Sequence, residues 1–320
     1  MNILVTGACG LIGSHLCDLL LNQEHTVFGL DNLLNSKIEN LPSGVNFIKH
    51  DIENPVSGNP FLGIKIDRIY HLACPASPVH YQKRPIKTML SSVLGTYHML
   101  EMAYDNNARF LYTSSSEVYG NTKNQPINEL QLGENIDTLS DRSCYVEGKR
   151  ASETLIWNYI KEKKLDVRIA RLFNCYGPRM AEDDGRVIAN FIFKRPIEIH
   201  GTGEQRRSFC YVTDTVEGLN KLMECDNPNK PINIGNPSGY ITIKKLAELI
   251  LELMEEEMIY GDDKIPSEEL TITHTRDRSN SEVFQRIPDI SEAIYYLKWS
   301  PKVTLIEGLK KTIKEMRKNG

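Results

Sequence analysis

Two residues one helical turn apart could together move a proton. Tyr145 and Lys149 stand four positions apart at the start of a predicted amphipathic helix, so their side chains point to the same place. A tyrosine, with an ordinary pKa of about 10, is a poor base at neutral pH, but a nearby ammonium group favours its phenolate form. Tyr145 could then accept a proton from a substrate hydroxyl. A plain surface pair has the same spacing, so the surrounding sequence must decide.

The run YTSSSEVYG at residues 112–120 supplies that context, because it ends a predicted strand. Ligands of open α/β sheets bind beyond the carboxyl ends of the strands, which places these hydroxyls and Glu117 at the site. Ser115 would hydrogen-bond the reacting hydroxyl, and Lys149 would lower the pKa of Tyr145 and hold a cofactor ribose. The predicted catalytic set is Ser115, Glu117, Tyr145 and Lys149.

A second set of residues predicts a dinucleotide site. Gly7, Gly10 and Gly13 follow the strand-like run 2–6 and open a helix-like run, in the spacing G-x-x-G-x-x-G. Gly7 permits a tight turn, Gly10 lets the backbone approach a pyrophosphate, and Gly13 allows close packing, with the helix N-terminus facing the phosphates. Asp31 closes the next strand, where a carboxylate accepts hydrogen bonds from ribose hydroxyls and repels a 2′-phosphate, which favours NAD over NADP.

Other interpretations exist for these acids, since Asp31 could be a strand-end cap and Asp51 a loop acid. In the dinucleotide interpretation Asp51, which ends the third strand, would contact the adenine edge. The full set of predicted cofactor-binding residues is Gly7, Gly10, Leu11, Ile12, Gly13, Asp31, Asn32, Asp51, Ile52, Leu72, Ala73, Cys74, Tyr145 and Lys149.

The elements that must position these residues alternate short β-branched or aromatic runs with longer helical patterns. Such alternation is typical of βαβ units in a parallel sheet covered on both faces. The sequence therefore predicts an α/β fold, a Rossmann-type doubly wound parallel sheet with a smaller C-terminal substrate-binding lobe. We expect domains at 1–173 and 174–320, with short segments of the second returning to the first. Strands are expected at 2–6, 26–30, 45–49, 68–73, 109–113 and 167–172, and later helices near 242–256 and 304–318.

Composition narrows the possible partners. The 320 residues are 40% hydrophobic and 25% charged, with a net charge of -4, so an ordinary globular core is expected and nucleic acid or an anionic membrane is disfavoured as a partner. Seven cysteines without a C-x-x-C pair indicate reduced thiols. Met1 directly before the first strand leaves no room for a leader, and no apolar run approaches membrane-spanning length. We therefore expect a cytoplasmic protein, and we expect no metal.

The chain as a whole resembles the extended short-chain dehydrogenases of the NAD-dependent epimerase/dehydratase family, and within them the UDP-glucuronate decarboxylases. The resemblance extends over essentially the whole chain and rests on five ordered blocks. These are HLACPASP (71–78), RSCYVEGKR (142–150), NCYGPRM (174–180), DGRVIANF (184–191) and RSFCYV (207–212).

The resemblance implies that NAD oxidises C4 of the sugar with Tyr145 as base, that the 4-keto acid loses CO2, and that NADH then reduces the product to UDP-xylose. It implies an active-site role for Glu117 near the sugar, a place for Arg186 near the reacting centre, and diphosphate contacts from Asn174 and Arg207. A homodimer through helices at about 86–105 and 144–163 is implied as well. The predicted substrate-binding residues are Asn174, Arg186, Asn190, Arg207 and Arg278, with Arg276 and Arg286 as further possible phosphate contacts.

Neighbouring activities stay open at this point. A 4,6-dehydratase would carry an aspartate where Ser116 stands, many 4-epimerases lack an acid at position 117, and a noncatalytic binding module is a third alternative. The chain also departs from the decarboxylase pattern at Leu90, Ser91 and Ser92, where Lys-Thr-Asn is usual. The lost lysine would remove a cation that could recognise glucuronate, so the identity of the sugar also stays open.

Overall fold

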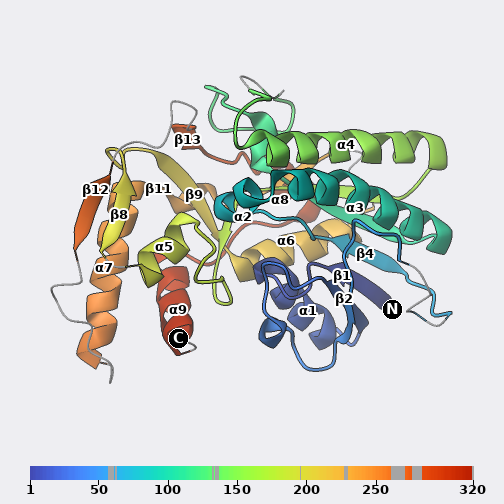
Figure 1. Ribbon diagram of the computed structural model, residues 1–320, viewed down its shortest axis with the longest axis horizontal. Coiled ribbons are helices and arrows are strands. Elements are labelled where there is room, and N and C mark those ends of the chain that lie inside the picture. The colour runs from blue at the N-terminus through green and yellow to red at the C-terminus, as the bar shows by residue number, and fades with distance from the viewer. Residues whose placement is uncertain are drawn as a thin grey trace.

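The computed structural model describes residues 1–56, 61, 63–131, 133, 137–194, 196–226, 230–260, 271–275 and 283–318. A seven-stranded, entirely parallel sheet occupies the larger part of the molecule (Figure 1). Its order is β10-β6-β5-β4-β1-β2-β3, so the order reverses between β1 and β4. This confirms the predicted α/β fold with a doubly wound sheet. The strands are β1 (Asn2–Thr6), β2 (Thr26–Asp31), β3 (Asn46–Lys49), β4 (Arg68–His71), β5 (Arg109–Ser115), β6 (Val167–Leu172) and β10 (Ile232–Ile234).

Helices cover both faces of this sheet, which explains why its central strands are apolar on both sides. Figure 1 shows α3 (Pro85–Asn106) and α4 (Ser143–Lys163) along one face, with α1 (Leu11–Asn22) and α6 (Val212–Glu224) along the other. In β1, Ile3 and Val5 pack in the same buried cluster as Leu16 of α1, whereas Leu4 packs in the cluster that contains Met99 of α3. Successive side chains of one strand thus point into two separate cores.

The remaining elements form a smaller C-terminal lobe, seen on the left of Figure 1. In it β9 pairs with β7, β11 and β13, and β8 pairs with β12. Its elements are β7 (Asn174–Tyr176), α5 (Val187–Phe193), β8 (Ile197–His200), β9 (Arg206–Tyr211), β11 (Tyr240–Thr242), α7 (Ile243–Tyr260), β12 (Ile272–Thr275), β13 (Gln285–Arg286) and α9 (Leu305–Lys318). Between them the chain returns to the large sheet with α6 and β10. Two short helices, α2 (Pro78–Lys83) and α8 (Ser291–Leu297), and three 3-10 helices, η1 (Ile38–Asn40), η2 (Ser116–Tyr119) and η3 (Pro237–Gly239), complete the described elements.

Three contacts join the region around β4 and α1 to the start of the C-terminal lobe. Arg179 Nη1 lies 2.7 Å from Asp18 Oδ2 of α1. The Ser77 hydroxyl donates to the carbonyl oxygen of Asp184, and His80 Nε2 lies 3.8 Å from Asp183 Oδ1. The segment that follows β7 therefore crosses the opening between the two parts. Among the helices described, none combines the length and the apolar character needed to cross a bilayer.

Candidate active site

A cavity of about 1800 Å³ opens where the carboxyl ends of the central strands face the C-terminal lobe. It exceeds the roughly 300–1,000 Å³ that is typical of a single small-molecule site, so it offers room for more than one ligand. Of the predicted site residues, those that line it are Gly7, Gly10, Leu11, Ile12, Gly13, Asp31, Asn32, Ile52, Leu72, Ala73, Cys74, Ser115, Glu117, Tyr145, Lys149, Asn174, Arg186, Asn190 and Arg207. Asp51 is absent from this lining, and Arg276 and Arg278 fall outside the described residues.

The glycine loop between β1 and α1 forms one end of the cavity. Gly7 has a φ of +70°, and its N–H donates to the carbonyl of Leu30 at 2.8 Å, so the chain turns at a left-handed position that favours glycine. A Cβ on Gly13 would collide with the backbone of Gly7, which prevents any larger residue there. The first turn of α1 thus presents its N-terminus to the cavity, the arrangement that suits a pyrophosphate.

Asp31 at the end of β2 orders the loops on either side of it. Its Oδ2 accepts the N–H of Cys9 at 3.0 Å, and its Oδ1 accepts the N–H of Leu33 and the hydroxyl of Ser36, each at 2.8 Å. The carboxylate is therefore fixed beside the glycine loop, where it faces the space that an adenosine ribose would fill. The cap interpretation and the ribose interpretation of Asp31 are compatible, because one carboxylate can accept more than three hydrogen bonds.

Asp51 lies beside the cavity lining in a network of its own. Lys87 Nζ of α3 lies 2.7 Å from Asp51 Oδ2 and 2.8 Å from Glu53 Oε1, and the Asn32 amide donates to Asp51 at 3.1 Å. Burial raises the pKa of Asp51. The hydrogen bonds that it accepts from Lys87, from the Glu53 N–H and from Asn32 outweigh this effect, so the net pKa lies below the usual value. Its contact with an adenine stays a prediction.

The Tyr145 and Lys149 side chains lie on one face of α4, buried against β5. Lys149 Nζ donates to the carbonyl oxygen of Thr113 at 2.7 Å and lies 5.9 Å from the centroid of the Tyr145 ring. Burial raises the pKa of Tyr145 to about 12, while the charge of Lys149 and a hydrogen bond with Ser115 lower it. Lys149 therefore lowers the pKa of Tyr145, as expected, but burial is the larger effect and the net pKa of the unliganded protein lies above the ordinary value of 10. Ser115 also accepts the N–H of Glu117 at 3.2 Å.

Glu117 is held by two arginines from distant parts of the chain. Its Oε2 lies 2.9 Å from Arg142 Nη2, at the start of α4, and its Oε1 lies 2.7 Å from Arg286 Nη1 of β13. Burial would raise the pKa of Glu117, but the charges of Arg286 and Arg142, with that of Arg207, lower it to about 2. Glu117 is thus a carboxylate at neutral pH, next to two guanidinium groups that could bind a second anion.

Sequence reasoning did not assign Arg142 and Arg286 to this cluster. Arg142 comes three residues before Tyr145, a helical spacing that could have indicated a shared site. The sequence indicates Arg286 only as a possible phosphate contact, because no local pattern connects it with Glu117. Its side chain is 3% exposed, and its Nε has no hydrogen bond among the residues that the structure describes.

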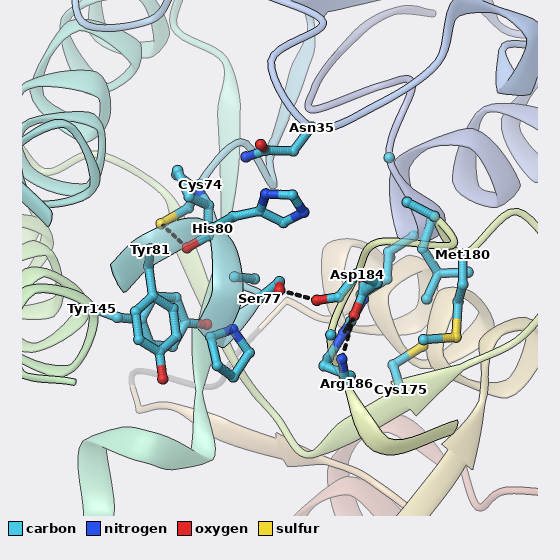
Figure 2. Close-up of a pocket in the computed structure, with 18 of the residues that line it drawn as sticks. Asn35, Cys74, Ser77, His80, Tyr81, Tyr145, Cys175, Met180, Asp184 and Arg186 are labelled. Atoms are coloured by element: carbon cyan, nitrogen blue, oxygen red, sulfur yellow. Dashed lines mark hydrogen bonds and ion pairs between the residues drawn. The ribbon is translucent and has the colours of Figure 1, made fainter. Parts of the chain in front are cut away.

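The predicted substrate-binding residues approach the cavity from the C-terminal lobe. Arg186 forms a two-pronged ion pair with Asp184, at 2.5 and 2.7 Å (Figure 2). The amide of Asn190 donates to the carbonyl of Gly185 at 2.9 Å, whereas its Oδ1 has no partner among the described residues. Asn174 donates to the carbonyl of Ser208 at 3.2 Å, and Arg207 Nη1 to that of Arg206 at 2.9 Å.

Three positions depart from the decarboxylase pattern, Leu90, Ser91 and Ser92. The position of the lost lysine, now Leu90, does not face the cavity in which the sugar would bind. Leu90 is 40% exposed on the outer side of α3 and does not line the cavity. Ser91 lines it and donates to Glu53 Oε1 at 2.5 Å. Ser92 is buried, 3.2 Å from Cys74 Sγ, where α3 meets α4. Leu90 therefore changes the outer surface of α3 and leaves the cavity wall unaltered, because the phase of the helix turns position 90 away.

Comparisons with known proteins agree with this geometry. The model of the "NAD dependent epimerase/dehydratase family" matches residues 3–235. UDP-glucuronic acid decarboxylase 6 of Arabidopsis thaliana is 44% identical over 97% of this chain and 87% of its own. The UDP-glucose 4-epimerase of Thermotoga maritima, solved with UDP-glucose, superposes with a TM-score of 0.87 at 30% identity, covering 100% of this chain and 99% of its own. The UDP-glucuronic acid 4-epimerase of Bacillus cereus, solved with UDP-glucuronic acid and NAD, gives a TM-score of 0.83 at 28% identity, covering all of both chains. The chain therefore belongs to the NAD dependent epimerase/dehydratase family.

Proposed function

We propose that this protein is an NAD-dependent decarboxylase that converts UDP-glucuronate to UDP-xylose. The observation that carries the proposal is the ionised Glu117 between Arg142 and Arg286, in the cavity that also contains Tyr145 and Lys149. It provides an anion-binding pair of cations next to a proton acceptor, as an acidic sugar requires. The decarboxylase from A. thaliana, whose identity to this chain is 44%, supports the choice of reaction.

The cavity fits NAD at the glycine loop and Asp31. Gly10, Leu11 and Ile12 would receive the pyrophosphate at the N-terminus of α1, and Asp31 would bind the ribose hydroxyls. When bound, NAD supplies a hydride acceptor, then a hydride donor, and a positive charge near Tyr145. Lys149, which is already fixed to the carbonyl of Thr113, would hold the nicotinamide ribose.

The chain's own part in the first step is proton transfer. Tyr145 would take the proton of the C4 hydroxyl, and Ser115, at the end of β5, would hold the same oxygen in line. Because the pKa of Tyr145 is about 12 in the unliganded protein, the phenolate forms readily only when further positive charge enters the site. Proton removal is thereby coupled to cofactor binding.

Oxidation at C4 makes the sugar a β-keto acid, which loses CO2 because the electrons of the broken C5–C6 bond delocalise into the C4 carbonyl. Arg142, which lines the cavity, would bind the substrate carboxylate before it leaves, with the buried Arg286 adding positive charge behind Glu117. Tyr145 with Ser115 would stabilise the enolate oxygen. Glu117, with a pKa of about 2, cannot donate the proton that C5 then needs while both arginines hold it, so that proton would come from water in the cavity. In this scheme Glu117 orients the two arginines.

The C-terminal lobe would bind the nucleotide half of the substrate. Arg207, with its planar and permanently charged fork, suits the diphosphate, and Asn174 and Asn190 approach the same wall of the cavity. Arg186 would lie near the reacting centre, as the resemblance implied. In this proposal the domain at 1–173 binds NAD, and the domain at 174–320, apart from the segments that return to the large sheet, binds the sugar nucleotide.

We further propose a cytoplasmic homodimer. All seven cysteines are free thiols, the state that cytosolic reductants maintain. The exposed apolar side chains of α3, including Leu94 and Tyr97, would form the dimer contact together with α4. Nothing in this assignment requires a metal or a nucleic acid.

The test is mass spectrometry of the products after purified protein is incubated with UDP-glucuronate, with and without added NAD. A UDP-pentose together with released CO2 is the expected result. An unchanged mass with inverted C4 stereochemistry would instead assign 4-epimerisation, the activity named for the neighbour from B. cereus. UDP-glucuronate has no C6 hydroxyl, so a 4,6-dehydratase would leave it unchanged and would instead remove water from UDP-glucose. Absence of reaction with either sugar nucleotide would favour a binding module.

A further inference from the structure

A second tyrosine covers the proposed base. Tyr81, on α2, lies flat on the ring of Tyr145, with the ring centroids 5.3 Å apart and an angle of 9° between the ring planes (Figure 2). Tyr81 is 2% exposed and Tyr145 is 8% exposed, so the contact is buried. Such a parallel contact at this separation is an offset stack, an arrangement that aromatic rings prefer over a face-to-face sandwich.

The backbone fixes Tyr81 independently of Tyr145. The Tyr81 N–H donates to the carbonyl of Ser77 at 2.9 Å. Its own carbonyl oxygen lies 3.7 Å from the thiol of Cys144, the residue immediately before Tyr145. Helices α2 and α4 are thus joined both by the thiol of Cys144 and by the stacked rings.

The hydroxyl of Tyr81 lies within the electrostatic reach of the anion-binding cluster. Burial raises the pKa of Tyr81 to about 12, while the charges of Arg142 and Arg286 lower it and that of Glu117 raises it. The ring therefore extends between the two parts of the proposed site, the proton acceptor and the arginine cluster.

We infer that Tyr81 is a positioning residue whose stacked ring fixes the orientation of the Tyr145 phenol for proton transfer. This inference rests on the proposed function. In that reaction Tyr145 accepts a proton when C4 is oxidised and returns one when C4 is reduced, so one misplaced hydroxyl slows two steps. A loss of alignment of this kind can cost up to about 100-fold in rate.

The stack and the hydroxyl of Tyr81 can be separated by substitution. Tyr81→Phe keeps the flat ring and removes only the hydroxyl. Tyr81→Leu removes the ring, and Tyr81→Met fills the space with a flexible chain that cannot lie flat. All three are compared with the wild type as NAD-loaded enzymes of equal cofactor content, with Tyr295→Leu, an exposed tyrosine on α8 outside the proposed site and the proposed dimer contact, as the control.

The first measurement does not depend on turnover. In protein labelled selectively at tyrosine, the ring-proton resonances of Tyr145 are identified by their loss in Tyr145→Phe. We expect an upfield ring-current shift in the wild type and in Tyr81→Phe, and its loss in Tyr81→Met and Tyr81→Leu. A wild type without this shift would overturn the inference, whatever the enzyme's substrate.

The second measurement follows NADH absorbance during a single turnover of UDP-glucuronate. We expect both its rise and its decay to slow by about 10- to 100-fold in Tyr81→Leu and Tyr81→Met, with KM within about 3-fold of the wild type. Tyr81→Phe should restore both rates. If both rates fell equally in Tyr81→Phe and Tyr81→Leu, or if KM rose while the rates stayed unchanged, the Tyr81 hydroxyl would bind substrate and the stack would have no positioning role. A wild type that leaves UDP-glucuronate untouched would refute the proposed function alone, since the resonance test would still stand.

Discussion

At the scale of single residues, burial and the neighbouring positive charge shift the pKa of Tyr145 in opposite directions. Burial raises the pKa of Tyr145, Lys149 with Ser115 offsets part of that rise, and the net value is about 12. A base must lose its proton before it can act, so each favourable charge near Tyr145 extends activity toward lower pH. The arrangement implies that Lys149 acts mainly by stabilising the phenolate of Tyr145 in the NAD-loaded enzyme.

Replacing Lys149 with methionine should therefore shift the pH dependence. Without the ammonium group the pKa of Tyr145 rises further, so the acidic limb of the profile of kcat against pH should move to higher pH, and kcat at neutral pH should fall by about 100-fold or more. The profile should be measured at saturating NAD. Tyr145→Phe serves as the control, because without the phenol group it should show only background activity, with no acidic limb in the profile of kcat against pH. An unmoved limb in Lys149→Met would contradict the electrostatic role.

Glu117 stabilises the fold as well as the site. Its pKa is about 2 when folded, below the ordinary value of 4.5, so its stabilising effect is present above pH 4.5 and is lost as the pH falls toward 2. Glu117→Gln leaves the buried Arg286 without its counter-charge, and we expect a loss of about 3 kcal/mol in the free energy of unfolding at pH 7.

Urea denaturation between pH 7 and about pH 3 checks this expectation. The difference between wild type and Glu117→Gln should shrink as the solution becomes more acidic, in the direction set by the lowered pKa. Glu252→Gln, at an exposed position on α7, should show little difference at either end of the range. A difference that does not depend on pH would indicate that packing, and not charge, accounts for the effect.

At the scale of elements, the position of Tyr145 and Lys149 depends on how closely α4 approaches α3. A Cβ on Gly148 would lie 2.8 Å from both Cβ and Oγ of Ser92, so the two helices are in contact through small residues. Ser92 also accepts at its carbonyl a hydrogen bond from Ser152, at 2.8 Å. The serine at position 92, which departs from the family pattern, thus lies in a helix contact.

Gly148→Ala should push the two helices apart. We expect a loss of about 1–3 kcal/mol in the free energy of unfolding, together with a fall in kcat as Tyr145 and Lys149 move. The double variant Gly148→Ala with Ser92→Gly removes the colliding Cβ and should recover part of both losses. A double-mutant cycle measures this coupling, and simple additivity of the two changes would argue against a steric origin.

The same scale explains which elements the sequence could predict. Strands β1, β2, β4, β5 and β6 are largely buried apolar runs bounded by turns or helices, and the edge strand β3 is a short run with two central apolar residues, so local composition indicates them. Strands β7, β10 and β11 have three residues each and depend on pairing with distant segments, which no local window records. Glu117, Tyr145 and Lys149 belong to local motifs, whereas the meeting of Glu117 with Arg286 depends on how β13 pairs with β9. Leu90 illustrates a third limit, because sequence proximity to Ser91 did not reveal which way the helix turns it.

At the scale of the whole molecule, α3 presents an apolar stripe to solvent. Ile86, Leu90, Leu94, Tyr97 and Tyr104 are each at least 40% exposed and recur at helical spacing, and Trp157 of α4 is also exposed. Apolar side chains gathered in this way favour burial against a second surface. A two-fold contact of α3 and α4 with their copies would bury the stripe in a self-complementary interface.

Leu94→Glu should therefore dissociate the proposed homodimer, because it places a charge in the middle of the buried stripe. Light scattering at micromolar concentration should give a dimer for the wild type and a monomer for the variant. Ile294→Glu on α8, an equally exposed apolar position outside the stripe, should remain dimeric. A monomeric wild type, or dissociation by Ile294→Glu as well, would reject this interface. Because α4 also holds Tyr145 and Lys149, a monomeric Leu94→Glu with reduced kcat would further connect assembly to the geometry of the proton acceptor.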